Sequence, residues 1–272
     1  MAKPKAQQWM PRLRPTGSGA VPPTGHAFRT EWIDFDRGIR VGNLEQHERI
    51  TQILKFNLEQ RHQQPFTLDR WGRGEFWQWI CWLPKANREA KPLSSHVNFG
   101  CAKFFISVDR DGRVFQSGMQ TERAPVRARG DYPGQTVKSD WDWHVLVRNL
   151  RKGGPLEREM RRLVCDDDFI IRVGAFEELE TIDASSFRGA AAVRKACEGF
   201  SKTEWGGLQL FYPMPEKELG ATDGPDLVEA ILAVFDELVP AMNLCMGLPC
   251  LKQPRRPEGL LHHEDTKVTK KI

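Results

Sequence analysis

The chain has 272 residues, of which 40% are hydrophobic and 28% are charged, and its formal net charge is +4 at pH 7. This balance is typical of a folded globular protein and excludes a largely disordered chain. No apolar run approaches the roughly 18–20 residues that a membrane helix requires, and no apolar signal core follows the N-terminus, so we expect a cytoplasmic protein without membrane contact. The six cysteines form no CxxC pair, and we expect them to be free thiols.

The N-terminal segment is basic and rich in proline and glycine. Residues 1–30 carry five basic side chains and no acidic one. Such a composition cannot bury enough apolar area to offset the entropy of ordering. The sequence therefore predicts that residues 1–28 form a disordered basic arm and that the folded domain begins at residue 29.

A helix and a strand are expected first in this domain. Asn43 is a suitable N-cap, and apolar residues at helical spacing predict a helix from there to about Arg61. Aromatic and β-branched residues then predict a strand at about 75–83.

A β-hairpin is the clearest local prediction. Two β-rich runs, residues 101–108 and 113–120, flank the turn Asp109-Arg-Asp-Gly112. Asp-Gly is typical of tight hairpin turns because glycine takes positive φ without steric cost, and we expect Gly112 to do so.

The remainder alternates helices and strands. We expect two helices first, from Asp140 to Leu150 and from Pro155 onward, and then a strand at 169–173. A helix from Ser185 or Ser186 to Cys197 and a strand at 208–212, stopped by Pro213, should follow. The last element is a long helix from Pro225 with Asp223 as its cap. From Lys252 onward the chain is again polar and basic, and residues 252–272 are predicted to form a flexible tail.

The densest aromatic segment holds Trp71, Trp77, Trp79 and Trp82. Such rings could stack on the bases of a single nucleic-acid strand, or they could build the core. Both faces of the predicted strand are apolar, which favours a buried central strand. Trp71, which lies outside that strand beside Arg70 and Arg73, is the one most expected to be exposed.

Two arginine-rich segments are candidates for phosphate contact. Arg123, Arg127 and Arg129 lie in a loop rich in glycine and proline, and six further basic residues lie between 148 and 162. The alternative is a solvated surface, since acidic residues lie near the second group in the sequence. The basic ends have a stronger case because few acids are near them. The predicted nucleic-acid-binding residues are Lys3, Lys5, Arg12, Arg14, Arg123, Arg127, Arg129, Arg255, Arg256, Lys270 and Lys271.

Catalytic patterns are sparse. Asp109 and Asp111 at the hairpin, and Asp166 to Asp168 before a strand, could hold a divalent cation, but no Glu-x-Lys occupies the second strand of the hairpin. The chain also has no GxGxxG before a helix, no Walker A motif and no GxSxG elbow. We therefore expect no cofactor and no metal site.

The order of these elements predicts an α+β protein: one domain, residues 29–251, with a mixed and largely antiparallel sheet packed against helices. Its expected function is a non-catalytic binding or assembly protein whose basic termini contact nucleic acid or an acidic protein, with self-association as a further expectation. The alternative is a metal-dependent nuclease or hydrolase that uses an unfamiliar set of the aspartates named above.

Overall fold

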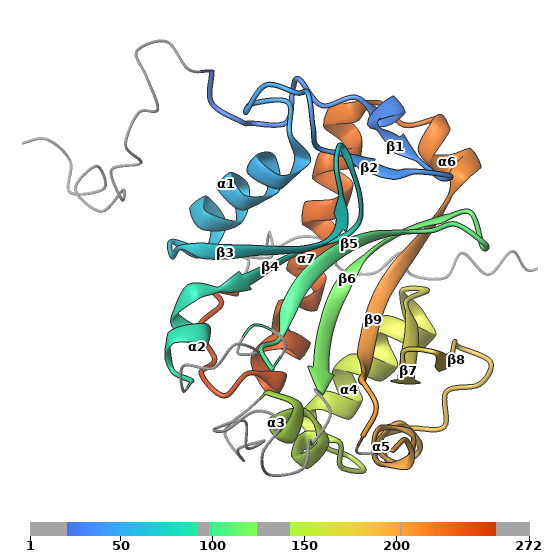
Figure 1. The fold of residues 1–272 in the computed structure, drawn as a ribbon. Helices are drawn as coiled ribbons and strands as arrows, with labels where there is room; N and C mark the ends of the chain where they lie inside the picture. Colours follow the sequence, from blue (N-terminus) through green and yellow to red (C-terminus); the bar gives the residue numbers. More distant parts are fainter. Residues whose placement is uncertain (1–20, 92–97, 99, 124–141, 202, 254–272) are drawn as a thin grey trace, which may run out of the picture.

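The chain folds as a nine-stranded sheet with its longest helix lying across one face (Figure 1). The computed structural model describes residues 21–91, 98, 100–123, 142–201 and 203–253. Every strand pairing within these ranges is antiparallel. The predicted α+β class with a largely antiparallel sheet is confirmed.

The strands are β1 (Ile33–Asp34), β2 (Gly38–Arg40), β3 (Phe66–Arg73), β4 (Phe76–Pro84), β5 (Lys103–Asp109), β6 (Val114–Arg123), β7 (Ile170–Ala175), β8 (Glu178–Ile182) and β9 (Gly206–Pro215). They follow the order β1-β2-β4-β5-β6-β9-β7-β8, and β3 pairs with β4. One edge of β4 therefore faces β3, while its other edge faces β2 at Phe76 and Trp77 and β5 from Trp79 to Trp82.

The helices are α1 (Ile50–His62), α2 (Lys85–Glu89), α3 (Asp142–Asn149), α4 (Pro155–Arg161), α5 (Ala190–Gly199), α6 (Glu216–Gly220) and α7 (Gly224–Cys245), with a 3-10 turn at Thr30–Trp32 and a π-helical turn at Arg162–Asp166. Asp223 caps α7 as predicted: its carboxylate accepts a hydrogen bond of 2.8 Å from the Asp226 amide. None of the helices in the described ranges is long and apolar enough to cross a membrane.

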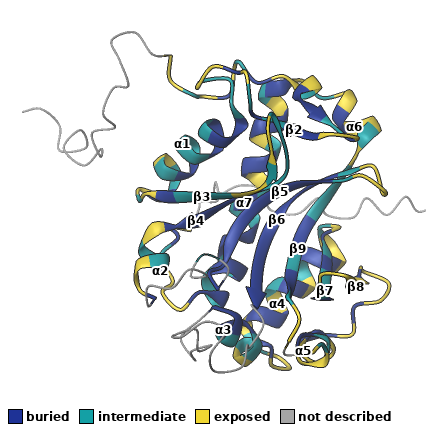
Figure 2. Ribbon diagram, in the orientation of Figure 1, coloured by how far each residue is buried: buried dark blue, intermediate teal, exposed yellow. Residues whose placement is uncertain are grey.

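Strand alternation divides the interior into two cores. On β5, Phe104 and Ile106 face the larger core with the helices, and Phe104 stacks on Phe235 of α7 with ring centroids 4.7 Å apart. Phe105 points to the opposite face of the sheet, where it joins a smaller cluster with Phe211. Burial on both faces is why β5 and β6 lie almost entirely in the interior (Figure 2).

The tryptophans divide as their positions in the sequence suggested. Trp82 is fully buried, and its indole Nε1 donates to the Thr51 carbonyl at 3.1 Å. Trp77 and Trp79 are half-buried on β4, which is an interior strand of the sheet. The side chain of Trp71 is 67% exposed, so the expected exposure of this ring is confirmed. All six cysteines are free thiols, and four are buried.

Two local predictions were wrong at specific residues. Asn43 does not cap a helix: it has positive φ, its amide donates to Glu75, and α1 begins only at Ile50. The hairpin between β5 and β6 is present, but Arg113 rather than Gly112 has positive φ. Gly112 is instead held by its amide, which donates to the Asp109 carboxylate at 3.0 Å.

Part of the N-terminal segment before residue 29 contacts the folded domain. Phe28 is only 2% exposed, and Gly25 lies close to Val228 of α7, so residues 25–28 of the expected arm pack on the domain. Strand β9 continues through Pro213 to Pro215 instead of stopping there. The short strands β1, β2 and β8 and the strand β3 were not predicted, and Asp140 lies outside the described residues.

Candidate functional site

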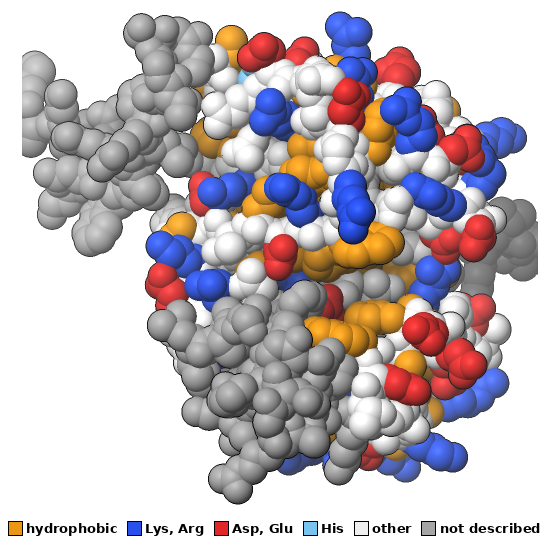
Figure 3. Space-filling view, in the orientation of Figure 1, with side chains coloured by type: hydrophobic (Ala, Val, Ile, Leu, Met, Phe, Trp, Pro, Cys, Tyr) orange, Lys and Arg blue, Asp and Glu red, His pale blue; other side chains and the backbone are white. Residues whose placement is uncertain are grey.

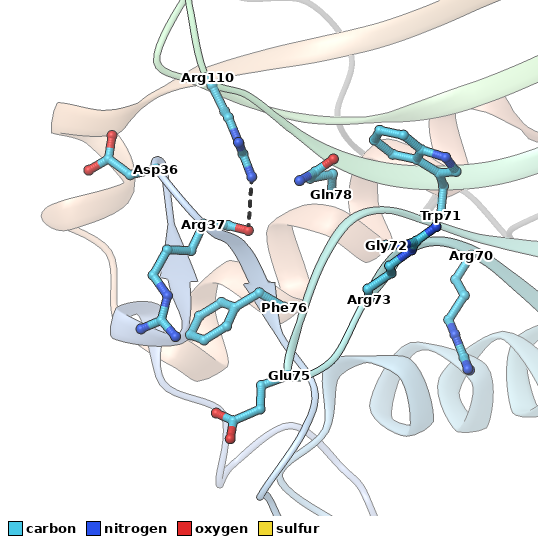
Figure 4. A pocket seen from close by; sticks show the side chains of 10 residues that line it. All are labelled: Asp36, Arg37, Arg70, Trp71, Gly72, Arg73, Glu75, Phe76, Gln78 and Arg110. Atoms are coloured by element: carbon cyan, nitrogen blue, oxygen red, sulfur yellow. Dashed lines mark hydrogen bonds between the residues drawn. The ribbon is translucent and has the colours of Figure 1, made fainter.

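A cavity of about 910 Å³ opens where three turns of the sheet meet. It is formed by the turn between β1 and β2, the hairpin between β3 and β4, and the turn between β5 and β6 (Figure 4). The lining side chains are Asp36, Arg37, Arg70, Trp71, Arg73, Glu75, Phe76, Gln78 and Arg110, together with Gly72. We call this the arginine–tryptophan cavity.

A β-bulge shapes the wall of the cavity. Trp71 pairs with Trp79, but the next residue, Gly72, pairs with Trp77, so Gln78 is left without a register partner on β3. Gln78 has none on the other edge of β4 either, because the pairing with β2 ends at Trp77 and that with β5 begins at Trp79. A bulge of this kind redirects side chains and increases the local twist.

Only glycine fits at the crossing point of the bulge. Gly72 has φ of +148°, and a Cβ there would lie 2.6 Å from the Cα of Trp77. Close approach of the two backbones therefore requires a residue without a side chain. The result is a tightly crossed hairpin that presents Trp71 on one side.

Four exposed arginines line the cavity, and two of them lie over aromatic rings. The guanidinium carbon of Arg37 is 3.8 Å from the centroid of Phe76, and that of Arg70 is 3.9 Å from the centroid of Trp77. Arg110 donates to the carbonyl oxygen of Arg37 at 3.3 Å. Arg70 lies on the opposite side of the hairpin from Trp71, as strand alternation requires (Figure 4).

These arginines have no acidic partners within the part of the chain that the structure describes. None of Arg37, Arg70, Arg73 and Arg110 forms an ion pair there, whereas Arg113 beside them pairs with both Asp36 and Glu216. The two acids of the cavity are engaged elsewhere: Asp36 contacts Arg113 at 3.0 Å, and Glu75 accepts from Asn43. The cavity therefore has a local excess of positive charge.

The arginine–tryptophan cavity belongs to a part of the surface that is rich in basic side chains. On the face shown in Figure 3, Lys and Arg side chains gather across the upper half, next to an exposed hydrophobic patch. The upper half is where β1, β2 and the hairpin of β3 and β4 lie (Figure 1). Weakly hydrated, planar guanidinium groups beside exposed apolar surface are typical of recognition sites for phosphates and stacked rings.

A second polar cluster lies on the sheet face opposite the helices, and it is closed. Gln120 accepts from the Trp79 indole at 3.1 Å and from Gln209 at 2.8 Å, and it donates to Glu122. Lys103 lies 3.3 Å from the Glu122 carboxylate, and the side chains of both are almost fully buried. Because these groups satisfy one another, the cluster is built for packing rather than for an external ligand.

Burial affects the two charges of this cluster differently. It raises the pKa of Glu122, because a buried carboxylate loses its hydration, although Lys103 opposes that change. For Lys103 burial, the largest single influence, would lower the pKa, but the charge of Glu122, the nearby Cys81 and Cys101 and the hydrogen bond to Glu122 together outweigh it, and the pKa is raised. Lys103 is therefore a charged, paired and structural side chain.

Asp142 is the centre of a third buried cluster. Its carboxylate accepts from Asn87 at 2.7 Å, from the Ala102 amide at 2.6 Å and from the Gly247 amide at 2.6 Å, and it pairs with Lys91 at 2.9 Å. Asp142 has no exposed surface. These contacts join α2, α3, the start of β5 and the end of α7, which indicates a structural role.

Arg123 is the only predicted nucleic-acid-binding residue that the structure describes. It is buried, its guanidinium donates to the carbonyls of Phe200 and Ser201, and its guanidinium carbon lies 4.0 Å from the centroid of the Phe200 ring. Burial also lowers its pKa. This geometry gives Arg123 a packing role, and its predicted contact with nucleic acid stays a prediction. The other predicted residues, Lys3, Lys5, Arg12, Arg14, Arg127, Arg129, Arg255, Arg256, Lys270 and Lys271, lie outside the described residues.

Two aspartates of the metal-site alternative are paired with arginines. Asp109 pairs with Arg172 at 2.8 Å, and Asp167 pairs with Arg162. Across the described ranges, no group of three or more His, Cys, Asp and Glu side chains could hold a metal ion. The nuclease or hydrolase alternative stays a prediction from the sequence.

A second basic surface is formed by residues that follow those of the first cavity in the sequence, at 150–152 and 191–199. Arg151, Lys152, Arg194 and Lys195 line a more open cavity of about 520 Å³ between the α3–α4 turn and α5. Arg194 is paired with Glu198 at 3.1 Å, and no aromatic side chain lines the cavity. It offers a natural control for the arginine–tryptophan cavity.

The comparisons with known proteins add no constraint. Neither a family model, nor a curated protein, nor a solved structure matches this chain.

Sequence reasoning found part of the arginine–tryptophan cavity and missed the rest. The pattern Arg70-Trp71-Gly-Arg73 identified an exposed tryptophan between two arginines. Arg37 and Arg110 were missed because they come from turns that are distant in sequence. The available signal was their position in short polar turns, each next to an acidic residue, which is too common to single them out.

Proposed function

We propose that this protein is a non-catalytic nucleic-acid-binding protein and that the arginine–tryptophan cavity is its folded contact surface. One observation carries the proposal: an indole that is 67% exposed lines the same cavity as four arginines, none of which has an acidic partner within the described residues. Leaving a large ring in water is unfavourable, and adjacent like charges repel.

Nucleic acid supplies both groups that this site lacks. Phosphates provide negative charge for the guanidinium groups, and bases provide flat faces for Trp71. An acidic protein would offer the charge but few aromatic faces. The basic termini, including Lys3, Lys5, Arg255 and Arg256, would then add longer-range attraction, and self-association and a cytoplasmic location stay predictions from the sequence.

The decisive experiment measures binding of fluorescently labelled oligonucleotides by anisotropy as a function of salt concentration. The variant that tests the site carries Arg37→Ala and Arg110→Ala, and the control carries Lys152→Ala and Lys195→Ala, which remove the same charge elsewhere. If each arginine neutralises one phosphate of a single strand, the slope of log affinity against log salt should fall by about 1.4 in the test variant. The control should bind nearly as the unmodified protein does.

A truncated protein separates the cavity from the termini. It should lack residues 1–20 and 254–272 but keep Phe28, which is buried in the domain. We expect it to retain binding that depends on Arg37 and Arg110. Loss of all binding on truncation, or equal effects of the test and control variants, would contradict the proposed contact surface.

A further inference from the structure

On the basis of that proposed function, we propose that the cavity takes an unpaired base, which stacks on Trp71 while the amide of Gln78 forms hydrogen bonds to its edge. The ligand class is therefore single-stranded nucleic acid, and the preferred base is adenine. Each part of this inference depends on a different feature of the cavity.

The first feature is the position of Gln78. It is the extra residue of the bulge, without a register partner on either edge of β4, and its side chain lines the cavity. In the view of Figure 4, its amide lies between the ring of Trp71 and the guanidinium of Arg110. The backbone irregularity thus places a planar hydrogen-bonding group in the same cavity as a planar stacking surface.

The second feature is that this amide is available. Within the described residues the Gln78 side chain makes no hydrogen bond, although the residue is half-buried. Other glutamines of the sheet form hydrogen bonds within the protein: the amide of Gln209 donates to that of Gln120. The edge of a base can therefore replace the water that this amide of Gln78 now meets, without breaking a hydrogen bond of the fold.

The third feature is the size and shape of the site. A volume of about 910 Å³ lies within the range, roughly 300–1,000 Å³, that sites for small molecules occupy. A base can lie flat on an indole only when its face is free, which a duplex does not allow without base flipping. An exposed ring on a rigid hairpin therefore favours a single strand over a duplex.

The chemistry of the amide determines the preferred base. Glutamine presents a donor and an acceptor side by side, and adenine offers the complementary pair at N6 and N7. A carboxylate in the same place would accept from the N4 amino group of cytosine instead. Gln78→Glu should therefore move the preference from adenine towards cytosine, which a merely structural role of this residue would not do.

The test uses the full chain with labelled oligonucleotides of twelve adenines, cytosines or thymines and a mixed-sequence duplex of the same length. Unmodified protein should bind the adenine strand most tightly and the duplex most weakly. Trp71→Ala should weaken binding to single strands about 5- to 150-fold, while Trp71→Phe should retain much of it. Gln78→Leu should remove the difference between bases, and Gln52→Leu, a half-buried glutamine on α1, serves as the matched control.

The outcomes separate this inference from the proposed function. If no oligonucleotide binds the unmodified protein, both are wrong. If oligonucleotides bind through Arg37 and Arg110, but the duplex binds as well as the single strands or Trp71→Ala has no effect, the proposed function stands and the single-strand inference fails. An adenine preference that survives Gln78→Leu would overturn the role of Gln78. Thermal unfolding of each variant confirms that it is folded.

Discussion

The arginine–tryptophan cavity and the cluster around Asp142 both contain charged groups, but those around Asp142 are buried and paired, whereas those of the cavity are exposed. At Asp142 every oxygen has a donor, and Lys91 is buried against it at 2.9 Å. In the cavity, exposed arginines stack on rings and, within the described ranges, have no carboxylate partner. Paired buried charge fixes the geometry of a fold, whereas unpaired exposed charge at a rigid site is available to a ligand.

The difference follows from the cost of leaving water. A buried charge without a partner is strongly destabilising, so the interior tolerates Lys91 only because Asp142 and Asn87 surround it. An exposed guanidinium keeps its hydration, and its lack of a partner costs the fold little. Substitutions in the two regions should therefore separate stability from binding.

The largest expected effect is on stability and comes from Asp142→Ala. This change leaves Lys91 buried without its counter-ion and removes the acceptor for the amides of Ala102 and Gly247. We expect the free energy of unfolding to fall by about 3–5 kcal/mol, measured by urea denaturation. Oligonucleotide affinity of the fraction that stays folded should not change. The exposed Glu178→Ala is the control, and equal stabilities of the two variants would contradict a structural role for this cluster.

His62 provides a test with pH, because it is an interior titratable group without a carboxylate partner in the described ranges. It is 2% exposed between Phe66 and Phe104, and burial lowers its pKa from 6.5 to about 4. Below pH 6.5 the imidazole of His62 therefore binds a proton in the unfolded chain, whereas in the folded chain it binds one only below about pH 4. Stability should be complete above pH 6.5 and fall by about 3 kcal/mol towards pH 4.

Chemical denaturation across this pH range, compared with a His62→Leu variant, isolates the effect. The variant should lose less stability than the unmodified protein on acidification, because it has no imidazole to charge. His26→Leu, at an exposed position, is the control. Parallel stability curves for His62→Leu and the unmodified protein would show that His62 does not carry this dependence.

The smallest expected effect is on oligonucleotide affinity and comes from Arg37→Lys in the cavity. Arg37→Lys keeps the positive charge but loses the planar group that lies over Phe76. We expect affinity for single strands to fall about 2- to 5-fold, with the salt slope and the unfolding temperature unchanged. A fall as large as that of Arg37→Ala would show that the plane matters more than the charge. No fall at all would show that only the charge matters.

Local signals predicted the fold best where one segment contains its own information. Asp223 before a long amphipathic pattern identified the cap of α7, and Asp109-Arg-Asp-Gly112 identified the hairpin of β5 and β6. The prediction for Asn43 failed because a distant residue, Glu75, binds its side chain. The short strands β1 and β2 were missed because two or three residues carry no periodicity.

The sequence by itself determined the α+β class, the hairpin, the capped final helix and the exposure of Trp71, because each depends on neighbours along the chain. Only the tertiary structure decided which charges lack partners. Arg37 and Arg110 line the same cavity as Trp71 because β2 and β5 meet the same edge of β4, and the bulge adds Gln78 to that lining. Register across strands that are distant in sequence is set by packing of the whole sheet, which no local pattern records.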